Sequence, residues 1–400
     1  MWWQKKLDRW VDHVRKQLGI PLRLTLWNGD QLDLGGNKPE VTIHVPRPAS
    51  LPYLLRPSLD SLGRAYIEGK LEVEGRLQAI VQIANQLAEL GSRQRTRLGK
   101  LFIPRSHSRA QDARAIAYHY DVSNEFYAAF LDPAMVYSCG YFEHGDEDLT
   151  TAQEKKIDHI LNKISIKPGQ TLLDISCGWG ALVIRAAQRY GAHCIGITLS
   201  AQQQAWANER IKLLGLQDQI RIQLLDYRDV HGQYDRITSV GMFEHVGLKN
   251  LPTYFRKLNE LLAVDGLMMN HGICTTNTDH RTARYGAGEF ISQYVFPQGE
   301  LPHIGSVLRA MQDGGLETID VENLRRHYAR TCTLWADNFE RNDALIRTLV
   351  DNKTYRIWRI YLAGCAHAFE HDWVALYQVL CGKAGRASHV LPWSRRYMYA

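Results

Sequence analysis

The stretch from residue 171 to residue 200 holds the residues best suited to chemistry. Its apolar first run leads into a polar and glycine-containing turn that carries Asp174, Ser176, Gly178 and Gly180. An alanine-rich apolar segment and a second apolar run follow, so the order predicts strand, glycine turn, helix and strand. Glycines let backbone approach a ligand, and a helix N-terminus favours an anionic group. A dinucleotide fingerprint would need a third glycine where Val183 stands, so that class is not indicated.

The elements after Ser200 extend the same pattern. Helical spacing over residues 201–214 and 251–262 alternates with strand-like runs over residues 220–225, 236–240 and 267–273. Strands separated by helices predict a parallel, doubly wound sheet, and ligands then sit beyond the carboxyl ends of its strands. Those ends carry Ser176, Thr198, Asp226, Gly241 and His271. Aromatic helical stretches over residues 328–339 and 355–369 could form a helical lid and an apolar channel.

Composition sets outer bounds on the class of protein. The 400 residues, 45% of them hydrophobic, are enough for one large domain with an appendage. No apolar run approaches the roughly 20 residues of a membrane span, and the N-terminus lacks a signal-peptide core, so we expect a cytoplasmic protein. The seven cysteines form no CxxC pair, which indicates reduced thiols and no metal site.

Residues 1–91 are predicted to form a small α+β domain. Residues 2–18 have the spacing of an amphipathic basic helix, which either packs on its own domain or lies in a membrane interface with Trp3 and Trp10 at headgroup depth. Short strands are expected over residues 22–27 and 41–45, and a helix over residues 71–90.

Residues 92–110 are predicted to be a basic linker to a second domain over residues 111–400. We call its cations and those just beyond it the basic strip: Arg93, Arg95, Arg97, Lys100, Arg105, Arg109 and Arg114. Asp112 is the only acid among them, and such a strip suits the phosphates of lipid headgroups or of nucleic acid.

Several motifs in order resemble known families. The glycine turn is similar to the first motif of the S-adenosylmethionine (SAM) methyltransferases, although a strand–helix turn with incidental glycines is the other interpretation. Across nearly the whole chain, the sequence resembles the cyclopropane fatty acid synthases. The segments that carry this resemblance are HYDVSNEFY (119–127), YSCGYFE (137–143), LDISCGWG (173–180), GITLSAQQ (196–203), YDRITSVGMFEHVG (234–247) and TCTLWADNFERN (331–342). AYIEGKLEVEG (65–75) resembles the N-terminal domain of the phospholipid-acting members, and plant N-methyltransferases share only some of these segments.

The resemblance implies a Rossmann-like class I SAM methyltransferase fold and a reaction at a cis double bond of a phospholipid acyl chain. Methylation of an alkene leaves a carbocation, and a base must remove a proton before the cyclopropane ring closes. Preorganised negative charge and aromatic faces would stabilise the cation. In the family the base is understood to be a bicarbonate ion, and its ligands fall on Cys139, Glu244, His271, Ile273 and Tyr328.

The SAM contacts of the family also map onto this chain. They fall on Tyr137, Ser138, Asp174, Gly178, Gly180, Thr198, Gln203, Asp226, Tyr227 and Arg228. Ser176, counted with the cofactor residues, stands where the family usually has glycine. If the backbone there has positive φ, serine would cost about 1 kcal/mol and weaken SAM binding by roughly tenfold.

The expected function is that of a SAM-dependent phospholipid cyclopropane synthase, peripheral on the inner face of the cytoplasmic membrane. Phospholipid membrane, rather than nucleic acid, is the expected partner, and the oligomeric state is left open, with a homodimer as one option. A methyltransferase that makes methyl-branched chains is the alternative enzyme. A non-catalytic lipid-binding homologue is the third interpretation, motivated by Ser176.

Overall fold

The computed structural model describes residues 2–36, 38–92, 122–278, 294, 300–386 and 391–399. Contacts divide the chain into two compact units, each described here by itself. The first unit combines residues 1–104, 282–297 and 339–367, and the second combines residues 105–281, 298–338 and 368–400. The linker beyond residue 92 and the basic strip lie outside the described residues.

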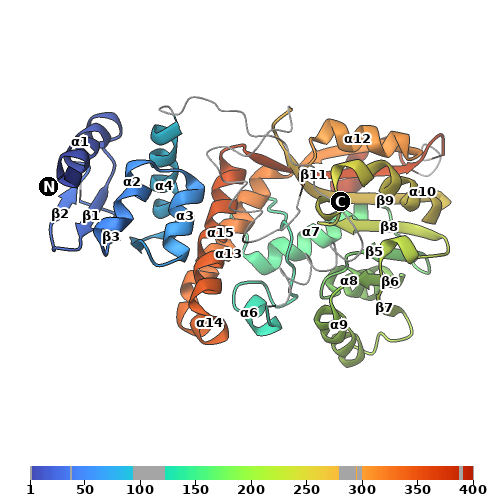
Figure 1. The fold of residues 1–400 in the computed structure, drawn as a ribbon. Helices are drawn as coiled ribbons and strands as arrows, with labels where there is room; N and C mark the ends of the chain where they lie inside the picture. The colour runs from blue at the N-terminus through green and yellow to red at the C-terminus, as the bar shows by residue number, and fades with distance from the viewer. Residues whose placement is uncertain are drawn as a thin grey trace. The chain divides into compact units, whose positions relative to one another are not determined.

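The N-terminal part of the first unit is a mixed four-stranded sheet with helices (Figure 1). The strand order is β2-β1-β3-β4, with β1 parallel to β3 and the other pairs antiparallel. Its elements are α1 (Trp2–Gln17), β1 (Leu22–Leu26), β2 (Gln31–Asp33), β3 (Val41–Val45), α2 (Leu51–Leu55), α3 (Leu59–Ile67), β4 (Glu72–Gly75) and α4 (Leu77–Ser92). The α+β architecture predicted for this region is confirmed.

Helix α1 turns its apolar face into this domain. Leu7, Val11 and Val14 are buried in the core that the sheet and helices share. Trp3 packs edge-on against Trp27 with ring centroids 4.8 Å apart, and Trp10 also lies against the core. The helix therefore uses its apolar stripe for packing inside its own domain, one of the two roles predicted from its spacing.

The helix predicted over residues 71–90 is wrong at its start. Residues 72–75 form β4, which pairs antiparallel with β3, and α4 begins only at Leu77. Glu72 to Glu74 alternate charged and apolar side chains, a period of two, and Gly75 with φ of 134° breaks the backbone before the helix.

The first unit also takes in helices from far along the chain, α14 (Asp343–Leu349) and most of α15 (Asn352–Glu370). Arg356 of α15 forms a bidentate ion pair with Glu72, at 2.8 Å to each carboxylate oxygen, and donates to the Tyr66 carbonyl. Arg359 pairs with Glu340 and reaches the Tyr66 hydroxyl. Two arginines thus join α15 to α3 and β4, because planar guanidinium groups match carboxylates in fork geometry.

The second unit is built on a seven-stranded sheet of order β10-β11-β9-β8-β5-β6-β7 (Figure 1). The strands are β5 (Thr171–Ile175), β6 (His193–Thr198), β7 (Ile220–Leu224), β8 (Tyr234–Val240), β9 (Leu262–Thr275), β10 (Leu316–Asn323) and β11 (Val374–Lys383). Strands β9, β8, β5, β6 and β7 are parallel, as the sequence predicts. Strands β10 and β11 add an antiparallel edge that the sequence analysis did not predict.

Helices cover both faces of this sheet. The helices are α6 (Asn124–Ala128), α7 (Leu149–Lys163), α8 (Ala181–Tyr190), α9 (Ala201–Leu213), α10 (Leu251–Leu261), α12 (Ile304–Asp313) and α13 (Arg325–Arg341). One core joins α7, α8 and α9 to Leu172 and Met269, and the other joins α10 and α12 to Leu173 and Met268. Successive strand residues face opposite cores, as a sheet buried on both sides requires. The doubly wound α/β fold is confirmed.

Among the described residues, no helix combines the length and apolarity needed to cross a bilayer.

Candidate active site

The turn between β5 and α8 has the left-handed backbone that its glycines predict. Ser176, Gly178 and Gly180 have φ angles of 65°, 55° and 84°. A Cβ atom placed on Gly178 would meet no other atom within 4 Å, so open space lies in front of the loop. Serine thus occupies a conformation that costs a residue with a side chain about 1 kcal/mol relative to glycine.

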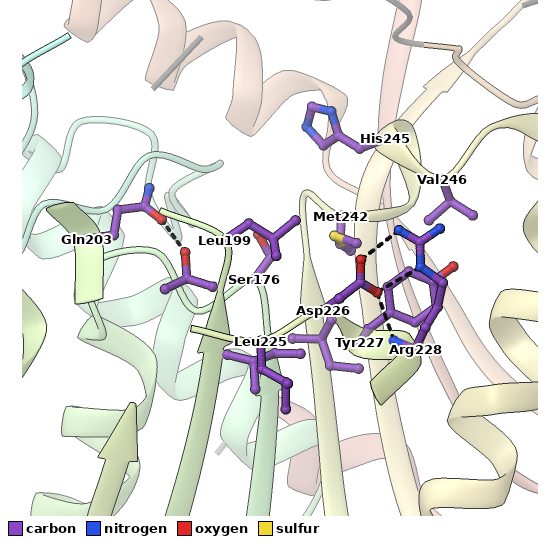
Figure 2. A pocket seen from close by; sticks show the side chains of 13 residues that line it. Ser176, Leu199, Gln203, Leu225, Asp226, Tyr227, Arg228, Met242, His245 and Val246 are labelled. Carbon is purple, nitrogen blue, oxygen red and sulfur yellow. Dashed lines mark hydrogen bonds and ion pairs between the residues drawn. The ribbon is translucent and has the colours of Figure 1, made fainter. Parts of the chain in front are cut away.

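A pocket opens at the carboxyl ends of the parallel strands (Figure 2). Apolar side chains form most of its wall, and Ser176, Thr198, Gln203, Asp226, Tyr227 and Arg228 add polar groups. Six of the residues assigned to SAM from sequence therefore line one pocket. Met242, His245 and Val246 line it as well, and the sequence analysis did not single them out.

Thr198 and Gln203 are joined across the end of β6. The Thr198 hydroxyl donates to the Gln203 side-chain oxygen at 2.7 Å and accepts the Ser200 backbone N–H at 3.1 Å. Ser200 caps α9 by accepting the Gln203 backbone N–H, as its position before the helical stretch indicates. The cap fixes the start of α9 and with it the side chain of Gln203 at the pocket wall.

Asp226 holds Arg228 beside the pocket. Its carboxylate accepts the Arg228 backbone N–H at 2.9 Å and pairs with the guanidinium at 2.8 and 2.6 Å (Figure 2). The guanidinium lies over the Tyr227 ring, 5.3 Å from its centroid. The three residues form one rigid, locally bonded group after β7.

Helix α7 fixes the segment that carries Tyr137 and Ser138. Gln153 donates to the Ser138 carbonyl at 2.7 Å, and the Lys156 ammonium donates to the Ser138 hydroxyl at 2.8 Å. The Tyr137 ring contacts the Trp335 ring with centroids 5.1 Å apart. Gln153 and Lys156 are buried polar residues that the sequence analysis missed, because their spacing on α7 reads as a solvated face.

The segment over residues 137–141 is buried at its centre. Cys139 and Gly140 are buried, and the Gly140 N–H donates to the Thr331 hydroxyl at 2.9 Å. The Cys139 thiol donates to the Gly140 carbonyl, and burial raises the pKa of the thiol, so the sulfur stays protonated. Cys139 therefore offers packing and backbone here rather than a thiolate nucleophile.

Asp174 lies behind the loop and does not line the pocket. Its carboxyl accepts the Thr238 hydroxyl at 2.7 Å, and burial raises its pKa to about 7, although Thr238 and the nearby Lys156 charge act in the opposite direction. A buried carboxyl needs such partners to be tolerated. In this structure Asp174 braces β5 against β8 below the glycine turn.

Glu244 and Ile273, from the predicted bicarbonate set, are directly bonded. Glu244 lies in the short 3-10 helix η3 (Phe243–His245) after β8, and its Oε1 accepts the Ile273 backbone N–H of β9 at 2.7 Å. The Phe243 ring packs against Gly272, where a Cβ atom would overlap it, and this fixes η3 on the strand. Glu244 Oε2 is buried with no hydrogen-bond partner among the described residues, and burial raises the Glu244 pKa to about 7.

His271 stands two residues before Ile273 on the same face of β9. Its Nδ1 is 3.2 Å from the side-chain amide nitrogen of Gln378, and its Nε2 is buried without a partner in the described part of the chain. Burial lowers its pKa well below the usual histidine value, and cations on α7, led by Lys156, add to this, so the ring is neutral.

Cys139 and Tyr328 meet this group through Leu324. The Leu324 carbonyl is 3.9 Å from the Cys139 sulfur and accepts the Tyr328 backbone N–H at 3.0 Å, while the Leu324 N–H bonds to Leu376. Leu376 of β11 pairs in register with Ile273. Backbone bonds through Leu324 and Leu376 thus link the segments that carry Cys139 and Tyr328 to Ile273 of β9, and we call the linked segments at the ends of β8 and β9 and the start of α13 the layer.

This layer fits a small oxyanion that carries one proton. A neutral histidine whose Nδ1 accepts a hydrogen bond has its proton on Nε2, and that atom can donate to an anion. Glu244 Oε2 can accept a hydrogen bond from the O–H group of the anion. Two buried polar atoms without partners, one donor and one acceptor, are what a hydrogencarbonate-like ligand would satisfy.

Replacing Ser176 with glycine is expected to tighten SAM binding by up to about tenfold. The left-handed backbone at this residue, with φ of 65°, relaxes without cost in glycine. Calorimetric titration of the Ser176→Gly variant with SAM checks this. Ser165→Gly, at another left-handed serine away from the pocket, is the matched control and should leave the affinity unchanged. Equal or weaker binding by Ser176→Gly would mean that the serine side chain makes a compensating contact.

Comparison with known proteins identifies the class and then the family. A solved structure, "Crystal Structure of mycolic acid cyclopropane synthase CmaA1 complexed with SAH and CTAB", aligns with a TM-score of 0.65 at 33% identity, over 70% of this chain and 99% of that one. The fold is that of the class I SAM methyltransferases. The mycolic acid cyclopropane synthetase family model matches residues 107–379, and this chain belongs to that family. A second model, a domain of unknown function (DUF7884), matches residues 10–95.

Curated relatives cover most of the chain. A "Probable fatty acid methyltransferase" of Pseudomonas putida is 46% identical over 96% of this chain and 98% of its own length. The cyclopropane-fatty-acyl-phospholipid synthase of Escherichia coli is 38% identical over 66% of each chain. The chain is therefore a SAM-dependent methyltransferase of this family, which confirms the class predicted from the sequence.

Proposed function

We propose that this enzyme transfers a one-carbon unit from SAM to the cis double bond of phospholipid acyl chains and closes a cyclopropane ring. The observation that carries the proposal is the pair of buried atoms without partners, Glu244 Oε2 and His271 Nε2, in the layer next to the cofactor loop. Ring closure needs a base at the new methyl group, and a pair of this kind can hold one. The E. coli relative, named for this reaction, supports the choice of substrate.

The pocket beyond β5, β6 and β7 supplies a site for SAM. SAM, when bound, supplies an electrophilic methyl group. The open space before Gly178 admits a ligand against the loop backbone, and the apolar wall with Thr198 and Asp226 suits an adenosine. Gln153 and Lys156 hold the Ser138 segment in place. These residues would hold the cofactor in one place, and positioning of the reacting groups is a large contribution to catalysis.

The layer around Glu244 supplies a site for bicarbonate. Bicarbonate, when bound, supplies the base. His271 Nε2 donates to the anion, and Glu244 Oε2 orients it by accepting its proton, while the bond to the Ile273 N–H keeps the Glu244 carboxyl from rotating. The negative charge held here also stabilises positive charge on the acyl chain.

A methyl-branched product is the second candidate function. The P. putida relative, which matches nearly the whole chain, is named a fatty acid methyltransferase. The two products share the first step and differ in which proton leaves the cation: loss from the new methyl group closes the ring, and loss from a neighbouring chain carbon leaves a methyl-branched alkene. The buried pair at Glu244 and His271 favours the ring, because a base at that position directs proton removal.

The deciding experiment uses purified enzyme, SAM and vesicles of monounsaturated phosphatidylglycerol or phosphatidylethanolamine. We expect mass spectrometry of the acyl chains to show the gain of one CH2 unit, with a product that resists mild hydrogenation. A product that takes up hydrogen would be the methyl-branched alkene, formed by loss of a proton from the chain instead of from the new methyl group. Vesicles left unchanged while free unsaturated fatty acids react would overturn the phospholipid assignment.

Membrane association is proposed to depend on the basic strip. Changing Arg93, Arg95, Arg97 and Lys100 to Gln should reduce co-sedimentation with anionic vesicles at low salt, since each cation contributes about 1 kcal/mol near such a surface. The control variant changes four exposed cations elsewhere to Gln and so lowers the net charge by the same amount. These cations are Lys212, Arg221, Lys249 and Arg256. Equal loss in both variants would show a general charge effect and not a local contact.

A further inference from the structure

Gln378 is buried beside His271, and no step proposed so far uses its side chain. It lies on β11, is fully buried, and pairs in register with His271 of β9 on one side and with Glu322 of β10 on the other. Its amide nitrogen is 3.2 Å from His271 Nδ1. An uncharged amide in the middle of a sheet core is costly unless it is bonded, so its bond to the histidine needs an account.

We propose that Gln378 is a positioning residue that fixes His271 in the form with its proton on Nε2, directed at the anion site. This inference rests on the function proposed above, because it assumes that the ligand between His271 and Glu244 is a hydrogencarbonate. It adds a residue outside the five expected ligands and assigns it one task.

The His271 ring carries a single proton. The ring is buried, and the ammonium groups of Lys156 and Lys163 on α7 disfavour a second proton on it, although Glu322 acts in the opposite direction. A neutral imidazole has one N–H, and the partner of one nitrogen decides which nitrogen carries it. An amide N–H donated to Nδ1 therefore places the ring proton on Nε2.

The Gln378 amide has a definite direction. Its nitrogen faces His271 Nδ1 at 3.2 Å, and its oxygen is buried without a partner in the described part of the chain. The reversed amide would put its oxygen on Nδ1 and draw the ring proton there. Nε2 would then present a lone pair to the anion, which would repel it. The orientation of the Gln378 amide therefore decides whether His271 Nε2 can donate a hydrogen bond to the anion.

A carboxylate at position 378 would act on His271 differently from the Gln378 amide. Glutamate has the same shape as glutamine but only accepts hydrogen bonds when ionised. Gln378→Glu would pull a proton onto Nδ1, giving either the opposite neutral form or an imidazolium. In both cases the state of the ring would depend on pH, whereas the histidine beside glutamine stays neutral across the working range.

The direct test is nitrogen NMR of the full chain labelled with 15N-histidine, with the His271 signals assigned by comparison with His271→Gln. We expect Nε2 to carry the proton and Nδ1 to be an unprotonated acceptor between pH 6.5 and pH 8.5, roughly the range around the ordinary histidine pKa. A protonated Nδ1 in the unaltered enzyme would overturn the proposal. This measurement needs no turnover, so it decides the role of Gln378 even if the enzyme makes another product.

Kinetics on two variants give the functional test. Gln378→Glu should raise the bicarbonate concentration for half-maximal turnover by about tenfold, the effect of one hydrogen bond, and add a new inflection to the pH profile. Gln378→Met, of similar volume but without an amide, should raise that concentration without the inflection. SAM affinity should be unchanged in both variants.

The matched control is Gln170→Met, which removes a side-chain amide bonded to the Lys167 N–H just before β5. It should behave as the unaltered enzyme. A Gln378→Glu variant with unaltered bicarbonate dependence and pH profile would overturn the positioning role. Absence of any bicarbonate dependence in the unaltered enzyme would instead remove the base from the proposed function, a distinct result.

Discussion

The Glu244→Gln variant is expected to lose at least about a hundredfold in turnover while it folds and binds SAM. Glutamine keeps the oxygen that accepts the Ile273 N–H, so η3 should stay on β9. The change falls on Oε2, the buried atom without a partner, which turns from an acceptor into a donor. An anion that donates a hydrogen bond to this atom would lose that bond. The negative charge of the Glu244 carboxylate, which stabilises the cationic acyl chain, would be lost too.

The pH dependence of stability gives an independent check on Glu244. Its pKa is raised to about 7 in the folded chain, so between roughly pH 4.5 and pH 7 the unfolded chain has released a proton that the folded chain retains. The free energy of unfolding should therefore fall as pH rises through that window, by about 3 kcal/mol at most. Glu244→Gln should lack this fall and be the more stable protein at pH 8.

Turnover assays and thermal unfolding of Glu244→Gln at pH 6 and pH 8 test both expectations. Glu154→Gln is the control, since Glu154 is an exposed carboxylate on α7 that pairs with Arg185. It should change neither quantity appreciably. Full activity in Glu244→Gln would remove this carboxyl from the mechanism.

The Lys156→Met variant is expected to bind SAM at least about tenfold more weakly and to lose about 3 kcal/mol of stability. Lys156 is 2% exposed and donates to the Ser138 hydroxyl. Burial lowers its pKa to about 8, and the acids Asp132 and Asp174 are near enough to oppose that shift. Removing the cation frees the Ser138 segment and leaves a buried carboxyl without its compensating charge.

Lys155→Met provides a closely matched control for this variant. Lys155 is the preceding residue on α7, and it pairs with the exposed Glu143 and with the mostly buried Glu147, away from Ser138. The pair with Glu143 contributes less than about 1 kcal/mol, as exposed ion pairs do. Calorimetric SAM titration and denaturant unfolding should separate the two lysines. Equal behaviour of the two variants would show that Lys156 has no special role at the cofactor site.

The parallel part of the fold could be predicted because its signals are local. The apolar strand, the glycine turn and the Ser200 cap each depend on residues close in sequence, and so do the positive φ angles at Gly178 and Gly180. Strands β10 and β11 gave no such signal. They lie on either side of long helices and pair with each other across more than 50 residues, and pairing at that distance depends on packing that a local pattern does not contain.

The residues of the candidate site could be predicted from the sequence, but the directions of their side chains could not. Motifs placed Asp174 at the cofactor turn, yet strand alternation turns its side chain toward Thr238, away from the pocket. Lys156 and Gln378 were missed for the opposite reason. Nothing in the type of a lysine or glutamine shows that a helix face or strand will be buried, since both residues are usually exposed.

The arginine contacts of α15 have a consequence for the order in which the chain folds during synthesis. The N-terminal core draws its residues from Leu7 to Leu90, so it can form once these residues have left the ribosome. Glu72 gains its ion-pair partner, Arg356, only after another 284 residues have been synthesised. The newly made N-terminal domain therefore exposes the surface around Glu72 and Tyr66 until α15 packs on it. A chain truncated before Arg356 would leave this surface uncovered.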